Sequence, residues 1–113
     1  MELFAGVAVS DFPRAVAWFE QLFGEPATFE AHDTERVWTL AEDRSIAVDL
    51  RPERAGYATV TVFLDDLDAF LEAAAARGVR PDKQETYGNG VRKAIFLDPD
   101  GNELGFGGAP VED

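Results

Sequence analysis

The stretch Ile95-Phe96-Leu97-Asp98-Pro99-Asp100-Gly101-Asn102-Glu103-Leu104 places the turn sequence Asp-Pro-Asp-Gly between two apolar segments. Proline presets φ for a turn, glycine tolerates positive φ, and aspartate side chains bond nearby backbone amides. The stretch therefore predicts a tight turn that joins a strand over residues 91–97 to a last strand over residues 102–106.

The residues before this hairpin predict a strand, a helix and a further strand. Residues 59–64 are rich in β-branched side chains, which favours a strand. Asp65 or Asp66 can cap a helix over about residues 67–77, and Gly78 can end it. A weak strand over about residues 83–87 and a turn at residues 88–90 then lead into the hairpin, which completes a βαβββ order.

The first half of the chain repeats this order. Residues 3–9 predict a strand, and Asp11 with Pro13 predicts the start of a helix that Gly24 ends. Strands are expected at residues 27–31, 36–41 and 45–50. The fold class expected is α+β, with two tandem βαβββ modules forming a half-open barrel-like cleft and the helices outside. We expect one domain over residues 1–113, with modules at about 1–50 and 57–107, a linker at 51–56 and a tail at 108–113.

Composition excludes several classes of function. The 113 residues include 22 acids and 10 Lys and Arg, which gives a net charge of −12. This charge argues against binding to nucleic acid or to an anionic membrane. No cysteine is present, and His32 is the one histidine, which disfavours most zinc and non-haem iron sites. The N-terminus has no basic leader pattern, so we expect a cytoplasmic protein.

Each predicted strand has a bulky aliphatic face and a lighter one. The aliphatic faces are expected to pack under the helices, and the lighter faces carry small, hydroxyl, aromatic and acidic side chains that suit a ligand pocket. Solvated faces, or a core filled by side chains, are the alternatives. The candidate ligand-binding residues are Phe4, Trp38, Asp49, Thr59, Thr61, Phe63 and Gly105.

Two of these candidates have specific expected roles. If Val37 packs under the helix, the indole of Trp38 faces the cavity or a partner and can stack on a planar or cationic group. Packing in the core is the alternative for Trp38. Asp49 alternates with aliphatic neighbours and is expected to hold a cationic group of a ligand, unless it lies at a solvated strand end.

Three stretches resemble the vicinal oxygen chelate superfamily, also called the glyoxalase/bleomycin-resistance/dioxygenase fold. The first runs from Val7 to Gly24 with an Asp-capped helix and an aromatic pair. The second is Leu64-Asp65-Asp66-Leu67-Asp68 with Gly78, and the third is the Asp-Pro-Asp-Gly-Asn turn. The resemblance covers nearly the whole chain, about residues 3–107.

The resemblance also implies positions for metal ligands. In metal-dependent members these positions carry histidine, glutamine or glutamate. The present chain has Phe4, Thr59, Gly105, and either Ala47 or Val48 at the matching places. We therefore expect no catalytic residue, no metal and no cofactor. Asp49 and Glu103 could at most form a weak site for a hard cation.

The metal-free members that the chain resembles are drug-binding proteins of the bleomycin-resistance type. The resemblance implies a homodimer that sequesters a small organic molecule, such as a cationic or planar antibiotic. The bound molecule would not be chemically changed, and the implied role is antibiotic resistance. One alternative is a lyase or isomerase that uses Asp49 or Glu103 as a general base. The others are a divalent-metal enzyme with non-standard ligands and a module that binds a protein partner.

Overall fold

The computed structural model describes residues 1–111 and confirms the predicted α+β class. The first βαβββ module comprises β1 (Leu3–Val9), α1 (Phe12–Phe23), β2 (Phe29–His32), β3 (Glu35–Ala41) and β4 (Arg44–Leu50). The 3-10 helix η1 (Pro52–Arg54) leads into the second module: β5 (Thr59–Leu64), α2 (Leu67–Ala76), β6 (Lys83–Thr86), β7 (Arg92–Leu97) and β8 (Glu103–Gly108).

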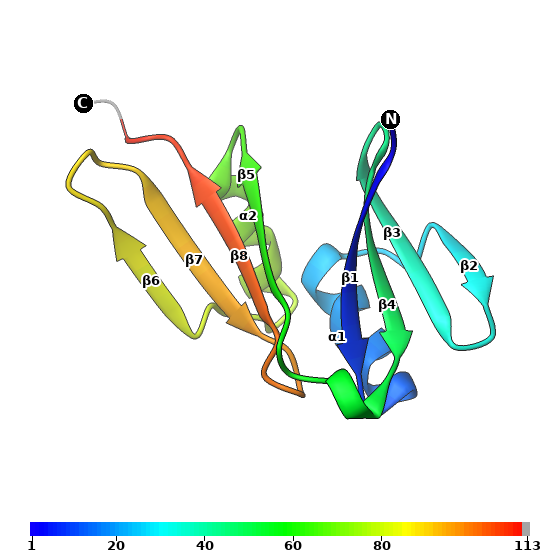
Figure 1. The fold of residues 1–113 in the computed structure, drawn as a ribbon. Helices are drawn as coiled ribbons and strands as arrows, with labels where there is room; N and C mark the ends of the chain where they lie inside the picture. The colour runs from blue at the N-terminus through cyan, green and yellow to red at the C-terminus, as the bar shows by residue number, and fades with distance from the viewer. Residues whose placement is uncertain (112–113) are drawn as a thin grey trace.

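Each module forms its own four-stranded mixed sheet. The strand orders are β1-β4-β3-β2 and β5-β8-β7-β6, in which β1 pairs with β4 and β5 with β8 in parallel. The sheets lie side by side with β1 and β5 as the inner edges, and both helices lie behind them (Figure 1). The molecule is therefore elongated, 48 × 29 × 25 Å, and the sheets do not close into a barrel.

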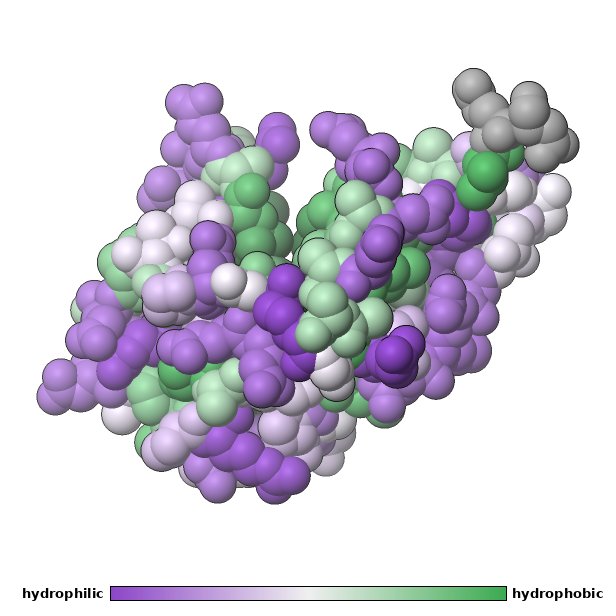
Figure 2. Space-filling model, turned by 180° about the vertical axis from the view of Figure 1, so that it is seen from behind, coloured by the Kyte–Doolittle hydropathy of each residue, from purple (hydrophilic) through white to green (hydrophobic). Residues whose placement is uncertain are grey.

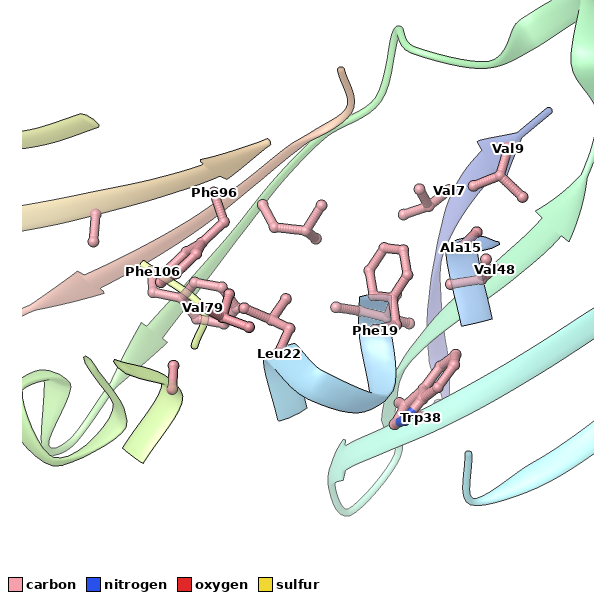
Figure 3. Close-up of a cluster of buried hydrophobic side chains, with 14 of the residues drawn as sticks. Val7, Val9, Ala15, Phe19, Leu22, Trp38, Val48, Val79, Phe96 and Phe106 are labelled. Carbon is pink, nitrogen blue, oxygen red and sulfur yellow. The ribbon is translucent and has the colours of Figure 1, made fainter. Parts of the chain in front are cut away.

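Strand alternation decides which side chains meet the helices. Val7 and Val9 of β1 and Val48 of β4 are at most 1% exposed and pack in the cluster that includes Phe19 of α1 (Figure 3). Leu104 and Phe106 of β8 join the same cluster from the second module. Burial of each such side chain stabilises the fold by roughly 1.5–3 kcal/mol. We call the opposite side of each sheet, which carries no helix, its open face.

Helix ends also link the modules. Asp11 accepts a hydrogen bond from Arg14 N (3.2 Å) at the start of α1, and Gly24 ends that helix with φ 77°. The guanidinium of Arg77, after α2, donates to the carbonyls of Gln21 (2.6 Å) and Leu22 (2.8 Å). Arg77 therefore caps the last turn of α1 and ties the C-terminal ends of the two helices together.

The Asp-Pro-Asp-Gly-Asn turn holds the modules together through Asn102, which is fully buried. Its Nδ2 donates to the carbonyl of Ala8 in β1 (2.8 Å), and its Oδ1 accepts from Gly56 N (3.1 Å) at the end of the linker and from Ala58 N (2.9 Å) directly before β5. Gly56 passes so close that a Cβ atom there would lie 2.6 Å from the carbonyl oxygen of Asp100. We call this set of contacts the Asn102 joint.

Asp98 stabilises the turn through hydrogen bonds to its backbone and to Asn102. Its carboxylate accepts from the backbone amides of Asp100 (3.0 Å) and Asn102 (2.8 Å) and from Asn102 Nδ2 (2.8 Å). Burial raises the pKa of the Asp98 carboxyl above its ordinary value, although the hydrogen bonds from Asn102 and Asp100 oppose this effect. Burial therefore disfavours the ionised form of Asp98, and the hydrogen bonds from these donors reduce this free-energy cost.

This pKa shift predicts a pH dependence that Asp98→Asn removes. The folded state holds the Asp98 proton more tightly than the unfolded chain does. The stabilisation from the neutral form is therefore complete below the ordinary pKa of 3.8 and is lost as pH rises through the raised folded-state pKa. Urea denaturation over this range should show the free energy of unfolding of the wild type falling relative to that of Asp98→Asn. A difference that stays constant or grows with pH would contradict the shift.

No helix among residues 1–111 is long and apolar enough to span a membrane.

Candidate ligand-binding site

The open face of the second sheet brings four predicted residues together. Thr59, Thr61 and Phe63 alternate along β5, and Gly105 lies beside Thr61 on β8. Phe63 is 63% exposed, and its ring also covers Gly107, where a Cβ atom would lie 3.1 Å from Phe63 Cδ2. Residues 59, 61, 63 and 105 thus form one continuous strip next to the inner edge of the sheet.

Phe4 and Asp49 lie on the open face of the first sheet but do not come together. Phe4 pairs with Ser45 at the start of β1, whereas Asp49 pairs with Ala8 near its end. Four residues of strand separate these positions, which corresponds to about 13 Å. Phe4 is 46% exposed, so its ring is open to a ligand or a partner.

Asp49 is held by neighbours of its own sheet. Arg51 Nε lies 2.8 Å from Asp49 Oδ2, and His32 Nε2 lies 4.0 Å from Asp49 Oδ1 and 3.5 Å from Glu35 Oε1. The backbone N–H of Thr34 donates to His32 Nδ1 (3.2 Å), so the neutral ring carries its proton on Nε2, toward the carboxylates. The ligand atoms of His32, Glu35 and Asp49 lie within 4.8 Å of one another. Metal binding through Nε2 would require the ring proton to move to Nδ1, which accepts from Thr34, so we interpret this arrangement as an ion-pair and hydrogen-bond cluster.

The expected orientation of Trp38 is wrong. Trp38 lies on the helix-facing side of β3, is 0% exposed, and packs against Phe19 and Phe23 of α1 with ring centroids 5.7 and 6.1 Å apart (Figure 3). Its Nε1 donates to the carbonyl of Glu25 (3.1 Å). Val37 takes the open face instead, so Trp38 is a core residue that a ligand in a cleft cannot reach.

A groove of about 610 Å³ separates the two modules. Figure 2 shows it from behind as a notch between the two halves of the molecule, with hydrophobic side chains on both walls. We call it the inter-module groove. Two predicted residues, Thr61 and Phe63, line it; the other apolar lining residues include Leu3, Ala5, Phe23, Leu40, Ile46, Val60, Val62, Leu64, Phe70 and Phe106.

The groove exists because the helices cover only part of the aliphatic faces. Val7 and Val9 are buried under α1, whereas Leu3 is 63% and Leu40 is 37% exposed. Alternation identifies these side chains as helix-facing, but the sequence gives no measure of how far a helix extends over its sheet. Sequence alternation alone therefore does not identify Leu3 and Leu40 as groove-lining residues.

The groove is also charged. Glu25, Arg44 and Asp65 belong to its lining, so two carboxylates accompany one guanidinium. A volume of this size is typical of sites for drug-sized molecules, which combine an apolar lining with a few polar groups. Fold and groove together define the class: a two-module α+β protein with a concave, mainly apolar site between its modules.

The chain belongs to the glyoxalase/bleomycin resistance protein/dioxygenase superfamily, whose family model matches residues 3–106. A search of curated proteins gives no match. Among solved structures, a glyoxalase/bleomycin resistance protein from Catenulispora acidiphila DSM 44928 is similar, with 54% sequence identity and a TM-score of 0.94. That alignment covers 97% of the present chain and 99% of the other.

Two further solved structures are similar to this chain. TnmS3, an antibiotic binding protein from Streptomyces sp. CB03234, is 27% identical with a TM-score of 0.70, and the alignment covers 98% and 96% of the two chains. A bleomycin-binding protein complexed with bleomycin is 21% identical with a TM-score of 0.77, and the alignment covers 96% and 98%. The second likeness shows a common fold.

The residues at the superfamily's metal positions do not fit a metal ion. Phe4 and Gly105 offer no side-chain donor atom, and Thr59 offers only a hydroxyl. In addition, Lys93 lies across Gly105: the Cβ position of that glycine is 3.5 Å from Lys93 Nζ. An ammonium at one of the ligand positions opposes a divalent cation by charge as well as by the missing donors.

Proposed function

We propose that this protein reversibly binds and sequesters a small planar organic molecule in the inter-module groove, without a metal ion. The observation that carries the proposal is the groove itself, about 610 Å³ in volume and lined by apolar and aromatic side chains. Burial of apolar ligand surface and contact with aromatic rings provide affinity. Glu25 and Asp65 favour a ligand that carries a cationic group, and the net charge of −12 adds long-range attraction.

The relatives support an antibiotic as the ligand class. The family includes bleomycin resistance proteins, and TnmS3 is an antibiotic binding protein at 27% identity. Sequestration of an antibiotic lowers its free concentration without any chemical change to it. The proposed physiological role is therefore protection of the cell that makes the protein, in the manner of drug resistance by binding.

The proposal includes a homodimer. The open face of the first sheet exposes two aromatic rings, of which Phe4 is 46% and Phe29 is 44% exposed. Both rings lie on the side of that sheet that carries no helix (Figure 1), so one partner can cover them together, and Phe63 of the second sheet stays free for the ligand. The partner proposed is a second copy of the chain, which would bury this surface. Clusters of exposed apolar side chains typically mark such interfaces.

Binding is tested with bleomycin and the planar cation acridine orange, titrated by calorimetry in EDTA. We expect at least one probe to bind, and Phe63→Ala to weaken that binding about tenfold through lost ring contact. Phe63 is 63% exposed, so its removal should leave the fold intact. Sedimentation of the same samples should give twice the chain mass.

Tyr57→Ala is the matched control. Tyr57 is 87% exposed and does not line the groove, so its loss should leave the affinity unchanged. The proposal fails if neither probe binds, if EDTA abolishes binding, or if Phe63→Ala binds as tightly as the wild type. A single-chain mass at micromolar concentration would contradict the dimer.

A further inference from the structure

Both lysines of the chain lie on the open face of the second sheet. Lys83 pairs with Ile95 between β6 and β7, and Lys93 pairs with Gly107 between β7 and β8. The register places both on the same side as Gly105 and Thr61. The sheet that contributes β5 to the groove therefore carries all the ammonium side chains of a strongly acidic protein.

The two lysines differ in their partners. Lys83 Nζ lies 2.9 Å from Glu85 Oε1, and the hydrogen bond with Lys83 lowers the pKa of Glu85. Glu85 is also the residue directly opposite Lys93 across β6 and β7. The Lys93 side chain extends across β8, over Gly105, although its charge still contributes to the lowered pKa of Glu85.

Lys93 occupies the space that Gly105 leaves open. The position that a Cβ atom would take on Gly105 lies 2.7 Å from Lys93 Cε and 3.5 Å from both Lys93 Nζ and Thr61 Oγ1. The ammonium and the hydroxyl therefore lie near the same point above β8, close enough for the two oxygens of one carboxylate to reach one group each. Thr61 also lines the inter-module groove, so it borders both the proposed ligand site and the point above β8.

The Lys93 ammonium forms no ion pair within residues 1–111. Ion pairs in this part of the chain engage Lys83, Arg36, Arg51 and Arg92, and none involves Lys93. Lys93 is also half-buried on the sheet face rather than extended into solvent.

We propose that Lys93 and Thr61 form a subsite for a carboxylate group of the small molecule that this protein binds. The ammonium supplies a charge-assisted hydrogen bond and the Thr61 hydroxyl supplies a second donor, while Gly105 leaves room for the Lys93 side chain to lie across β8. This proposal rests on the proposed function and adds a chemical group that the ligand must carry. The ligand is a planar molecule that carries a carboxylate in addition to any cationic group held by Glu25 or Asp65.

The test compares 2-naphthoate with its neutral analogue 2-naphthalenemethanol, using amide chemical shifts of the full chain. We expect naphthoate to bind about tenfold more tightly than the alcohol, with the largest shifts at Thr61, Gly105 and their neighbours. Lys93→Met should remove this preference and leave the weaker affinity for the alcohol unchanged.

Two further variants make the test specific. Lys83→Met is the matched control, because it removes the other lysine of the same face and should preserve the preference for naphthoate. Gly105→Ala keeps the ammonium but places a Cβ atom 2.7 Å from Lys93 Cε, so it should displace Lys93 and reduce the preference. Both variants keep the apolar groove.

The subsite is disproved if naphthoate binds no more tightly than the alcohol, or if Lys93→Met retains the preference. It is equally disproved if Lys93→Met dissociates the dimer and leaves naphthoate affinity unchanged, because the ammonium then serves a partner chain. Failure of the proposed function is a separate result: neither acridine orange nor the alcohol would shift the amide of Phe63, whatever naphthoate does at Gly105.

Discussion

Asn102→Ala is expected to lower the free energy of unfolding by about 3–4 kcal/mol, because it removes the Asn102 joint. The side chain makes four hydrogen bonds of 2.8–3.1 Å, to Ala8 O, Asp98 Oδ2, Gly56 N and Ala58 N. Alanine would leave these partners without the amide that satisfies them, and each unsatisfied buried group costs about 1–3 kcal/mol. Relaxation and water entry reduce the sum, which is why the expected total is smaller than four full penalties.

Urea denaturation followed by circular dichroism measures this loss. Asn89→Ala is the matched control, because Asn89 is the one other asparagine and, within the described residues 1–111, its side chain bonds only Val91 N (3.0 Å) in an exposed turn. We expect the control to change stability by less than about 1 kcal/mol. A loss for Asn102→Ala as small as that of the control would show that the modules are held together elsewhere.

Asn102→Ala should also weaken ligand binding under conditions in which the variant is still folded. The joint connects β1, the linker and the turn before β8, and the groove lies between the modules that these segments hold. Looser modules would make the groove less preformed, and binding would then have to restore its shape. Unchanged affinity for acridine orange in the folded variant would contradict this link between joint and groove.

Trp38→Ala is expected to lower the free energy of unfolding by about 3–5 kcal/mol, as is typical for removal of a large buried aromatic side chain. The indole packs against Phe19 and Phe23, which are themselves part of the cluster under α1. It also satisfies the carbonyl of Glu25 through Nε1. No neighbour can fill such a large void without displacing α1.

Trp18→Ala is the control for Trp38→Ala, since Trp18 is only half-buried and contacts Phe19 by its edge. Thermal and urea denaturation should rank Trp38→Ala well below Trp18→Ala in stability. Trp38→Phe keeps most of the packing and should leave the affinity for acridine orange unchanged. A large loss of affinity in Trp38→Phe with little loss of stability would instead return Trp38 to the ligand site.

The error at Trp38 has a physical cause. Val37 and Trp38 are consecutive in β3, and both are at most 1% exposed, so both faces of this strand bury an apolar side chain. Hydrophobic alternation cannot decide between two apolar neighbours. The packing of α1 decides, because Phe19 and Phe23 offer a surface large enough for the indole.

At Lys93, in contrast, alternation along β7 is enough to assign the face of the sheet but not the residue that Lys93 contacts. Its place on the open face follows from the pattern of β7, yet its contact with Gly105 depends on the pairing of β7 with β8. That register is set by the tertiary structure. Only the register shows that a glycine on one strand leaves space for the lysine of the next.

Local sequence determined the order of helices and strands, the capping residues and the turn at residues 98–101, because turns, caps and strand alternation depend on residues a few positions apart. The two-module plan followed from the repetition of these local signals. Tertiary structure alone decided the Asn102 joint, the burial of Trp38, the groove that the helices leave uncovered and the position of Lys93 over Gly105. Each of these features depends on contacts between segments that are distant in the sequence. Burial, strand register and the extent to which a helix covers a sheet are set by those contacts and cannot be derived from any one segment.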